Sequence, residues 1–220
     1  MLDIQKIKDI AISEVLSPTS ALTQQLLSVN KIVYKDGVPV IEDIIFAEDD
    51  VAVVYFPIVD ESYYFVAYVD YEPSPELRSV CMTAANVVEL VVVSERHALE
   101  ELTGLLKDIE FSKTWGKGET KRGRLVCEDS GFVIKLDIKK TGEVENKIQD
   151  IIKLLSNYKD EVRELSRMAD AVEISIGYFG YTDQMWGIHL DSKTIQDLAE
   201  LGVSLDIDLY ASGPALPYED

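Results

Sequence analysis

The chain has few of the residues on which covalent cross-links and metal sites depend. It contains two cysteines and two histidines among 220 residues. Cys81 and Cys127 lie far apart, and neither belongs to a CxxC pair or has a histidine at metal-ligand spacing. The sequence therefore predicts two reduced thiols and no bound metal or other cofactor. Hydrophobic residues make up 47% of the chain, which is enough to build a sizeable core.

Cations are also scarce. Lys and Arg together number 21 against 40 Asp and Glu, which gives a formal net charge of −19. So acidic a chain repels nucleic acid and anionic membrane surfaces, and it favours a basic partner. An acidic surface that only keeps a cytoplasmic protein in solution would have the same composition, and both interpretations stay open.

Long hydrophobic runs are absent. No apolar run approaches the roughly 18 residues that a membrane-spanning helix requires. The first 16 residues are interrupted by charges and have neither the apolar run nor the cleavage site of a signal peptide. We therefore expect a cytoplasmic protein with no membrane association.

The N-terminal residues show the periodicity of amphipathic helices. Apolar residues recur at helical spacing over residues 3–16, which predicts a helix that stops before Pro18. Thr19 can cap a second short helix that runs to Leu27.

The period then changes to two, which is typical of strands. Residues 32–34 and 38–41 predict a hairpin around Asp36-Gly37, a pair that favours a tight turn. Residues 51–59 and 62–69 predict two longer strands, so that this part of the chain forms an antiparallel meander.

Residues 36–77 carry eleven acidic side chains and no Lys or Arg. Tyr and Phe residues are interleaved with them, and strand alternation places neighbours on opposite faces of a sheet. Exposed tyrosines beside carboxylates are typical of a protein-binding surface, although carboxylates also gather in turns simply because they are solvated there. The residues that we expect to bind a partner are Glu42, Asp43, Glu48, Asp49, Asp50, Asp60, Glu61, Tyr63 and Tyr71.

Pro73-Ser74-Pro75 is the best candidate for a boundary between two units. Proline removes a backbone donor and discourages a helix, which suits a connector. We expect one unit over residues 1–77 and a second over residues 78–220, packed together because the connector is short.

Residues from 87 onward alternate between strands and helices. The predicted elements are a strand over 87–93, a helix capped by Ser94, a hairpin of 125–128 and 132–138, a helix over 143–168 with a break near Asn157, strands over 172–176 and 185–190, a helix from an Asp191 or Ser192 cap to Gly202, and a strand over 203–210. This order predicts an α+β fold in which N-terminal helices and a meander pack on a ferredoxin-like sandwich with a mixed, mostly antiparallel sheet.

Residues 113–124 form the one basic loop, and Gly116 and Gly118 lie within it. Glycines among cations can cradle a phosphate, but the loop lacks Walker A spacing and no strand leads directly from it into a helix. The alternative is a turn with special backbone angles whose Trp115 packs onto the sheet.

Residues 85–213 contain a recognisable pattern. It consists of Trp115, Lys117-Gly118-Glu119 and Ser130-Gly131, followed by Leu190, Leu198, Leu201-Gly202, Leu205, Asp208 and Tyr210. In this pattern the chain resembles the bacterial domain-of-unknown-function family 4279, with Phe132 where members often have Trp. Residues 1–84 lie outside the resemblance. The family is similar in turn to the small acidic immunity proteins of bacterial toxin loci, which implies a binding role.

Two groups of residues could carry chemistry. His97 follows Ser94 and precedes Glu100 and Glu101, but contacts of this spacing at the start of a helix are ordinary capping geometry, and no catalytic residue is assigned there. Asp206 and Asp208 share one face of the last predicted strand, where they could hold a hard cation or be solvated. With them, an alternative ligand pocket would comprise Trp186, His189, Asp206, Asp208 and Tyr210.

The preferred function is a non-enzymatic bacterial binding protein, of the immunity type, that neutralises a basic partner through its acidic, Tyr-rich surface. One alternative is a divalent-cation-dependent enzyme or small-ligand binder that uses Asp206, Asp208 and His189. Another is a self-associating structural protein, a homodimer in which a strand edge of the meander pairs across a two-fold axis.

Overall fold

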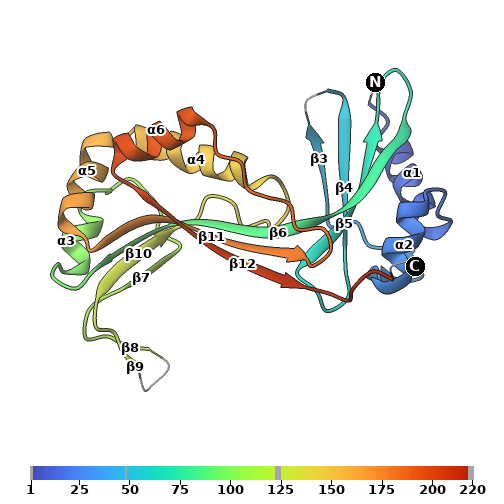
Figure 1. The fold of residues 1–220 in the computed structure, drawn as a ribbon. Coiled ribbons are helices and arrows are strands. Elements are labelled where there is room, and N and C mark those ends of the chain that lie inside the picture. Colours follow the sequence, from blue (N-terminus) through green and yellow to red (C-terminus); the bar gives the residue numbers. More distant parts are fainter. Residues whose placement is uncertain (1, 48, 122–124, 218–220) are drawn as a thin grey trace. The chain divides into compact units, whose positions relative to one another are not determined.

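The computed structural model describes residues 2–47, 49–121 and 125–217 (Figure 1). The fold is α+β, as predicted, with six helices and a mostly antiparallel sheet in the described part of the chain. Among these residues no helix is long and apolar enough to cross a membrane.

The chain divides into two compact units that differ from the expected division at Pro73-Ser74-Pro75. Unit 1 takes its residues from Met1–Ala85, Tyr178–Gly187 and Leu209–Asp220, and unit 2 from Asn86–Gly177 and Ile188–Asp208. The boundaries fall inside strands because β6 (Glu76–Ser94), β11 (Ala171–Tyr181) and β12 (Ser204–Ser212) each contribute residues to both units. The two prolines lie in the connection between β5 (Tyr63–Asp70) and β6.

Unit 1 begins with the two predicted helices, α1 (Ile4–Leu16) and α2 (Ala21–Val29). The side chain of Asp3 caps α1 by accepting a hydrogen bond from the amide of Lys6. Ser20, and not Thr19, occupies the cap position of α2, because Thr19 is engaged by Glu14 from α1.

The meander of unit 1 is present as predicted, and it contains one further strand. The strand order is β6-β5-β4-β3, where β4 is Val51–Pro57 and β3 is Asp43–Ala47, and all three pairings are antiparallel. The small hairpin of β1 (Tyr34–Lys35) and β2 (Val38–Pro39) turns at Asp36-Gly37, where φ is 52° and 80°. Both residues therefore adopt the left-handed conformation that this type of turn requires.

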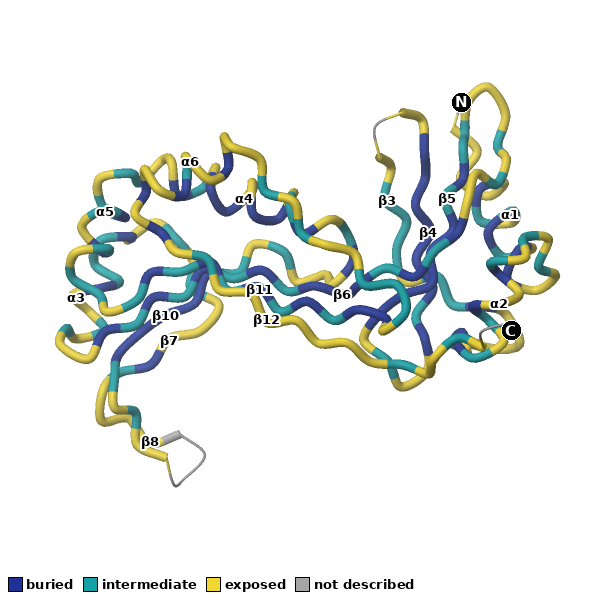
Figure 2. The backbone as a smooth tube through the Cα atoms, viewed as in Figure 1, coloured by how far each residue is buried: buried dark blue, intermediate teal, exposed yellow. Residues whose placement is uncertain are grey.

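The helices α1 and α2 supply the apolar layer that covers one face of this sheet (Figures 1 and 2). Their buried residues meet alternate residues of the strands, as the period of two requires. The main cluster consists of Ile7, Ala11, Val15, Leu26, Ile32, Ala52, Val54, Phe56, Ile58, Tyr63, Phe65, Ala67, Val69, Val80, Met82 and Tyr181.

Unit 2 is built on the later residues of β6. The strand β10 (Ser130–Ile134) pairs with β6 on one side and with β7 (Lys113–Trp115) on the other. Every second residue of β11 from Val172 to Gly180 is buried, so one of its faces looks into a core. The helices α4 (Val144–Ser156), α5 (Lys159–Met168) and α6 (Ser192–Leu201) lie together on one face of the unit 2 strands, as Figure 1 shows.

Three elements predicted for residues 125–190 differ from the structure. The expected long helix is divided into α4 and α5 at residues 157–158, as the predicted break near Asn157 allows. The prediction of a hairpin between residues 125–128 and 132–138 is wrong, because β9 (Leu125–Val126) pairs with β8 (Thr120–Lys121) instead. Residues 185–190 form an irregular loop and not a strand.

Candidate functional site

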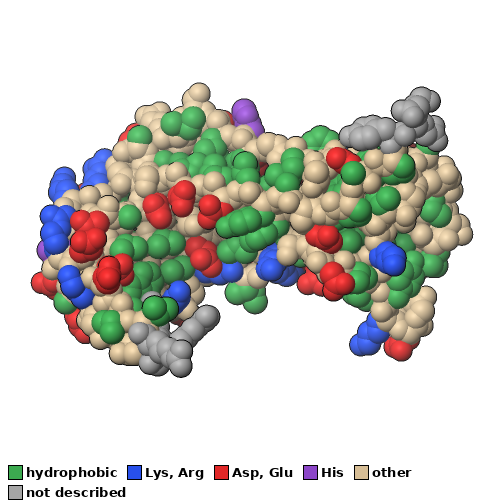
Figure 3. All heavy atoms as spheres, turned by 60° about the horizontal axis from the view of Figure 1, so that its bottom comes forward, with side chains coloured by type: hydrophobic (Ala, Val, Ile, Leu, Met, Phe, Trp, Pro, Cys, Tyr) green, Lys and Arg blue, Asp and Glu red, His purple; other side chains and the backbone are tan. Residues whose placement is uncertain are grey.

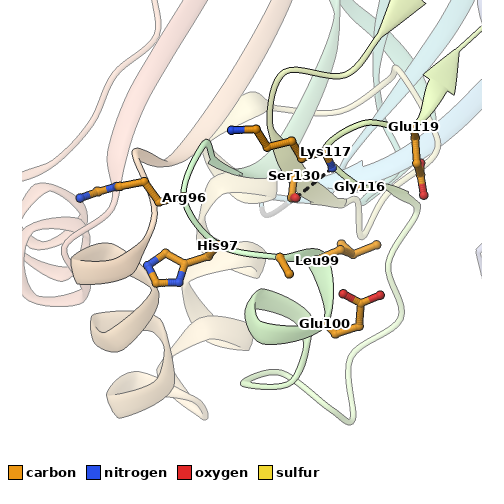
Figure 4. Close-up of a pocket in the computed structure, with 9 residues that line it drawn as sticks. Arg96, His97, Leu99, Glu100, Gly116, Lys117, Glu119 and Ser130 are labelled. Carbon is orange, nitrogen blue, oxygen red and sulfur yellow. Dashed lines mark hydrogen bonds between the residues drawn. The ribbon is translucent and has the colours of Figure 1, made fainter.

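Unit 2 contains a pocket of about 480 Å³ that we call the unit 2 pocket. One wall is the turn after β6, the opposite wall is the loop after β7, and the start of β10 contributes to the lining. Its lining residues are Arg96, His97, Ala98, Leu99, Glu100, Gly116, Lys117, Glu119 and Ser130 (Figure 4).

The first wall is held by Ser94 and Asp170. The Ser94 hydroxyl oxygen accepts hydrogen bonds from the amides of Arg96 (3.3 Å) and His97 (3.2 Å). The Asp170 carboxylate accepts from the amide of Glu95 (2.8 Å) and from the Arg96 guanidinium (3.1 Å). The bond from the Glu95 amide, assisted by the charge of Arg96, holds the pKa of Asp170 below its usual value. These contacts fix the turn and hold one nitrogen of the Arg96 guanidinium.

The second wall shows why Gly116 and Gly118 are not a phosphate cradle. The amide of Lys117 donates to Ser130 Oγ (3.0 Å), that of Gly118 to the carbonyl of Cys127 (2.8 Å), and that of Glu119 to the carbonyl of Gly116 (3.1 Å). A phosphate cradle needs backbone amides that are not already hydrogen-bonded within the protein and can donate to the anion. The alternative interpretation describes the loop better, because Gly118 has φ +85° and Trp115 is buried against Gly131.

The charged side chains of the unit 2 pocket are segregated by sign. Figure 4 shows Arg96, His97 and the Lys117 ammonium toward one side, with Glu100 and Glu119 toward the other. The Lys117 ammonium donates to the carbonyl of Glu95 at 2.7 Å. In the described part of the chain no carboxylate pairs with Lys117, and no cation pairs with Glu100 or Glu119.

The relay of Ser94, His97 and an acid is not assembled. Nδ1 of His97 lies 3.5 Å from Oε2 of Glu101, and the same Glu101 oxygen accepts the amide of Ala98 at 2.9 Å. Among the described residues no hydrogen bond joins the side chains of Ser94 and His97. The prediction that Ser94 caps the helix is wrong, because the N-cap residue of α3 (Leu99–Thr103) is Ala98, and Ser94 instead accepts the amides of the turn before it.

Most of the described acidic residues within residues 36–77 form two groups at opposite ends of the strands. Val51 pairs with Asp70 and Asp70 with Glu76, so the β3–β4 and β5–β6 connections lie at the same end. Asp43 pairs with Tyr55, four residues farther along β4, about 13 Å from Val51 at the rise of a strand. We call Phe46, Asp49, Asp50, Tyr71, Glu72 and Glu76 the Phe46 end, and Asp36, Glu42, Asp43, Asp60 and Glu61 the Glu42 end. Glu48 lies outside the described residues.

The two tyrosines that we expect to bind a partner differ in their exposure to solvent. Tyr63 is 1% exposed and its hydroxyl donates to Oδ1 of Asn30 (2.9 Å), so its assignment to a partner-binding surface is corrected. Strand alternation turns it to the helix-covered face. Tyr71 is half-buried and packs edge-on against Phe46, with 5.8 Å between ring centroids. Phe46 is 42% exposed and was missed, because β3 itself was not predicted.

Tyrosines beside carboxylates give unit 1 a testable response to alkali. Burial, and then Glu42 and Asp43, raise the pKa of Tyr64, while burial and Glu61 raise the pKa of Tyr63. The neutral phenols therefore stabilise the folded state below the ordinary pKa of 10.0, and this stability is lost as the pH rises from 10.0 through the folded-state pKa. We expect the urea midpoint to fall above pH 10.0 and to fall less in Tyr64→Phe. If the urea midpoint fell equally with pH in the wild type and in Tyr64→Phe, the raised pKa of Tyr64 would be contradicted.

The alternative ligand pocket is spread over the two units. Trp186 and Tyr210 belong to unit 1, where the indole donates to the carbonyl of Met82 (2.8 Å) and Tyr210 stacks on Phe179 (4.8 Å between centroids). The other three belong to unit 2, and all three are exposed: His189, Asp206 and Asp208.

The described residues form no metal centre around these carboxylates. In the described residues no three His, Cys, Asp or Glu side chains come together in a way that could hold a metal ion. The strand β12 instead exposes apolar and acidic residues alike, including Ile207 and Leu209 beside Asp206 and Asp208. Hydrophobic and acidic side chains also lie close together on the face that Figure 3 draws. The use of this set in ligand binding stays a prediction.

The strands and helices described above define an α+β protein with a mixed-charge pocket and an acidic sheet end. A family model described as "Domain of unknown function (DUF4279)" matches residues 83–212, so the chain belongs to this family, as its resemblance predicted. Neither the curated proteins nor the solved structures gave a match. The matched region includes the unit 2 pocket and leaves out the Phe46 end.

Proposed function

We propose that this chain is a non-enzymatic binding protein that holds a basic protein partner at the Phe46 end. The observation that supports this proposal is an accessible aromatic pair, Phe46 on Tyr71, beside carboxylates that are exposed to solvent. An aromatic anchor provides area, and the carboxylates around it select a cationic partner and speed its approach.

The charge balance of the Phe46 end favours a cation. Asp49, Asp50, Glu72 and Glu76 are exposed, and burial together with the charge of Asp50 raises the pKa of Tyr71. Arg78 forms an ion pair with Asp70, with 2.6 Å between Nη2 and Oδ1. That pair is neutral as a whole, so the net charge that faces solvent at this end is negative.

The proposed role includes finer expectations from the sequence. We propose that the protein acts in the bacterial cytoplasm, and that neutralisation of a basic toxin, as by an immunity protein, is one form of such binding. A ferredoxin-like arrangement within residues 78–220 is proposed on the order of its elements alone.

A pair of charge-matched variants tests the proposal. The first carries Asp49→Asn, Asp50→Asn and Glu76→Gln at the Phe46 end, and the control carries Asp36→Asn, Glu42→Gln and Asp60→Asn at the Glu42 end. Both lose three charges. Asn tolerates the positive φ of Asp36, Asp49, Asp50 and Asp60, so neither variant strains the turns.

The partner is captured from the native host with the wild-type chain, and its affinity is then measured for each variant at low and high salt. We expect the first variant to bind at least about tenfold more weakly, the control to bind nearly as well as wild type, and wild-type binding to weaken with salt. Phe46→Ala should weaken binding at both salt concentrations. Equal losses in the two variants, or binding that salt does not change, would refute the proposal.

A further inference from the structure

We infer that the unit 2 pocket binds a small zwitterionic ligand, of the class of amino acids and short peptides with free termini. The ligand carboxylate would meet the Lys117 and Arg96 side, and its ammonium group the Glu100 and Glu119 side. This inference does not depend on the proposed function, because the pocket and the Phe46 end belong to different units.

The first argument is that charged groups of both signs are available. Lys117 uses one of its three N–H donors on the carbonyl of Glu95. Arg96 is held by Asp170 through one guanidinium nitrogen and keeps its other donors. Glu100 and Glu119 have no cationic partner among the described residues. Each side of the pocket can therefore form charge-assisted hydrogen bonds with a group of opposite sign.

The second argument is the buried hydroxyl of Ser130. Ser130 is 1% exposed, lines the pocket, and accepts the amide of Lys117 at 3.0 Å. A serine hydroxyl that accepts one hydrogen bond still has a proton to donate, and within the described part of the chain no acceptor receives it. A ligand carboxylate oxygen that reaches Lys117 would find this donor on the same side.

The charge pattern decides between ligand classes. A phosphate is disfavoured because the loop amides are already used and Glu100 and Glu119 would repel it. A polyamine is disfavoured by Lys117 and Arg96. A molecule with one carboxylate and one ammonium group satisfies both sides at once. A cavity of about 480 Å³ has the size of pockets that take small molecules, and Leu99 offers an apolar surface between the charges.

The test is a titration of the full chain with alanine, dialanine, trialanine and tetraalanine, followed by amide chemical shifts. We expect one length to bind with a Kd of about 1 mM or below, with the largest shifts at Lys117 and Ser130. N-acetylation or C-terminal amidation of that peptide should each weaken binding about tenfold, because each removes one charged end. The inference would be overturned if no peptide of the series binds, or if neither acetylation nor amidation weakens the binding.

Variants connect each terminus with its side of the pocket. In Lys117→Met, amidation of the peptide should cause little further loss, whereas acetylation should still weaken binding. In Glu119→Gln combined with Glu100→Gln the pattern should be reversed. Lys153→Met and Glu164→Gln, at exposed positions of α4 and α5, are the matched controls and should bind as wild type does. Equal sensitivity of all variants to both modifications would place the peptide elsewhere and overturn the inference.

Discussion

Replacing Gly131 with alanine is expected to destabilise the protein by about 3 kcal/mol. A Cβ at this position would lie closer than 3.0 Å to Cζ2 of Trp115 and to the carbonyl oxygen of Val92. The carbonyl belongs to β6, which pairs with β10 through Val93 and Gly131, so it cannot move without breaking the ladder. Trp115 is held by a hydrogen bond from its indole to Asp129 (2.5 Å) and cannot turn aside freely.

The midpoint of urea unfolding measures this effect, and Gly187→Ala is the control. No atom lies within 4 Å of a Cβ built on Gly187, so that change should alter stability by no more than about 0.5 kcal/mol. In a Trp115→Leu background the cost of Gly131→Ala should fall, since one of the two clashing groups is gone. A cost that is the same in both backgrounds would show that Trp115 is not responsible.

Elements with strong local signals could be predicted from the sequence. The helices α1 and α2 follow from apolar residues at helical spacing, and the β1–β2 hairpin from Asp36-Gly37, whose backbone has the positive φ angles that such a turn needs. The helix α6 begins and ends where predicted, because the Asp191 side chain accepts the amide of Thr194 and Gly202 adopts φ 72°. In each case the determining contact lies within a few residues.

Pairing between distant segments could not be predicted in the same way. The sequence predicts a strand of seven residues over 87–93 where the structure has the 19-residue β6, because the first part of β6 lacks a continuous apolar run. The loop over residues 182–191 alternates like a strand, yet the Trp186 indole bonds to the carbonyl of Met82, more than a hundred residues away. Such contacts depend on which segments the chain brings together, and local periodicity does not encode this.

The same limit applies to the candidate sites. The carboxylates of residues 36–77 lie close together along the chain, yet nine of them are divided between two ends of a sheet, because successive antiparallel strands return to alternate ends. The unit 2 pocket joins residues near Arg96 with residues near Lys117 and Ser130, which only the pairing of β10 with β6 and β7 brings close. The sequence indicated the residues Lys117 and Ser130, but not that they share a cavity.

Replacing Glu14 with alanine is the second change for which we expect a large effect. It should lower the free energy of unfolding by about 3 kcal/mol. Glu14 is 3% exposed, and its carboxylate accepts the amide (3.0 Å) and hydroxyl (2.6 Å) of Thr19 and the amide of Ser20 (3.1 Å). It therefore ends α1 by fixing the turn that starts α2. Alanine would remove the acceptor that these donors share and would leave the buried place of the Glu14 side chain unfilled.

The dependence of this effect on pH separates the carboxylate from mere packing. Burial alone would raise the pKa of Glu14, but the hydrogen bonds from Thr19 and Ser20 outweigh it and hold the pKa below its ordinary value of 4.5. A depressed pKa means that the stabilisation is present above pH 4.5 and is lost as the pH falls through the folded-state value. Glu14→Gln keeps the shape and removes the charge, so its deficit relative to wild type should shrink as the solution is acidified below pH 4.5. Exposed Glu164→Gln should show no such trend, and a Glu14→Gln deficit that stays constant with pH would mean that packing, and not the charged acceptor, holds the two helices together.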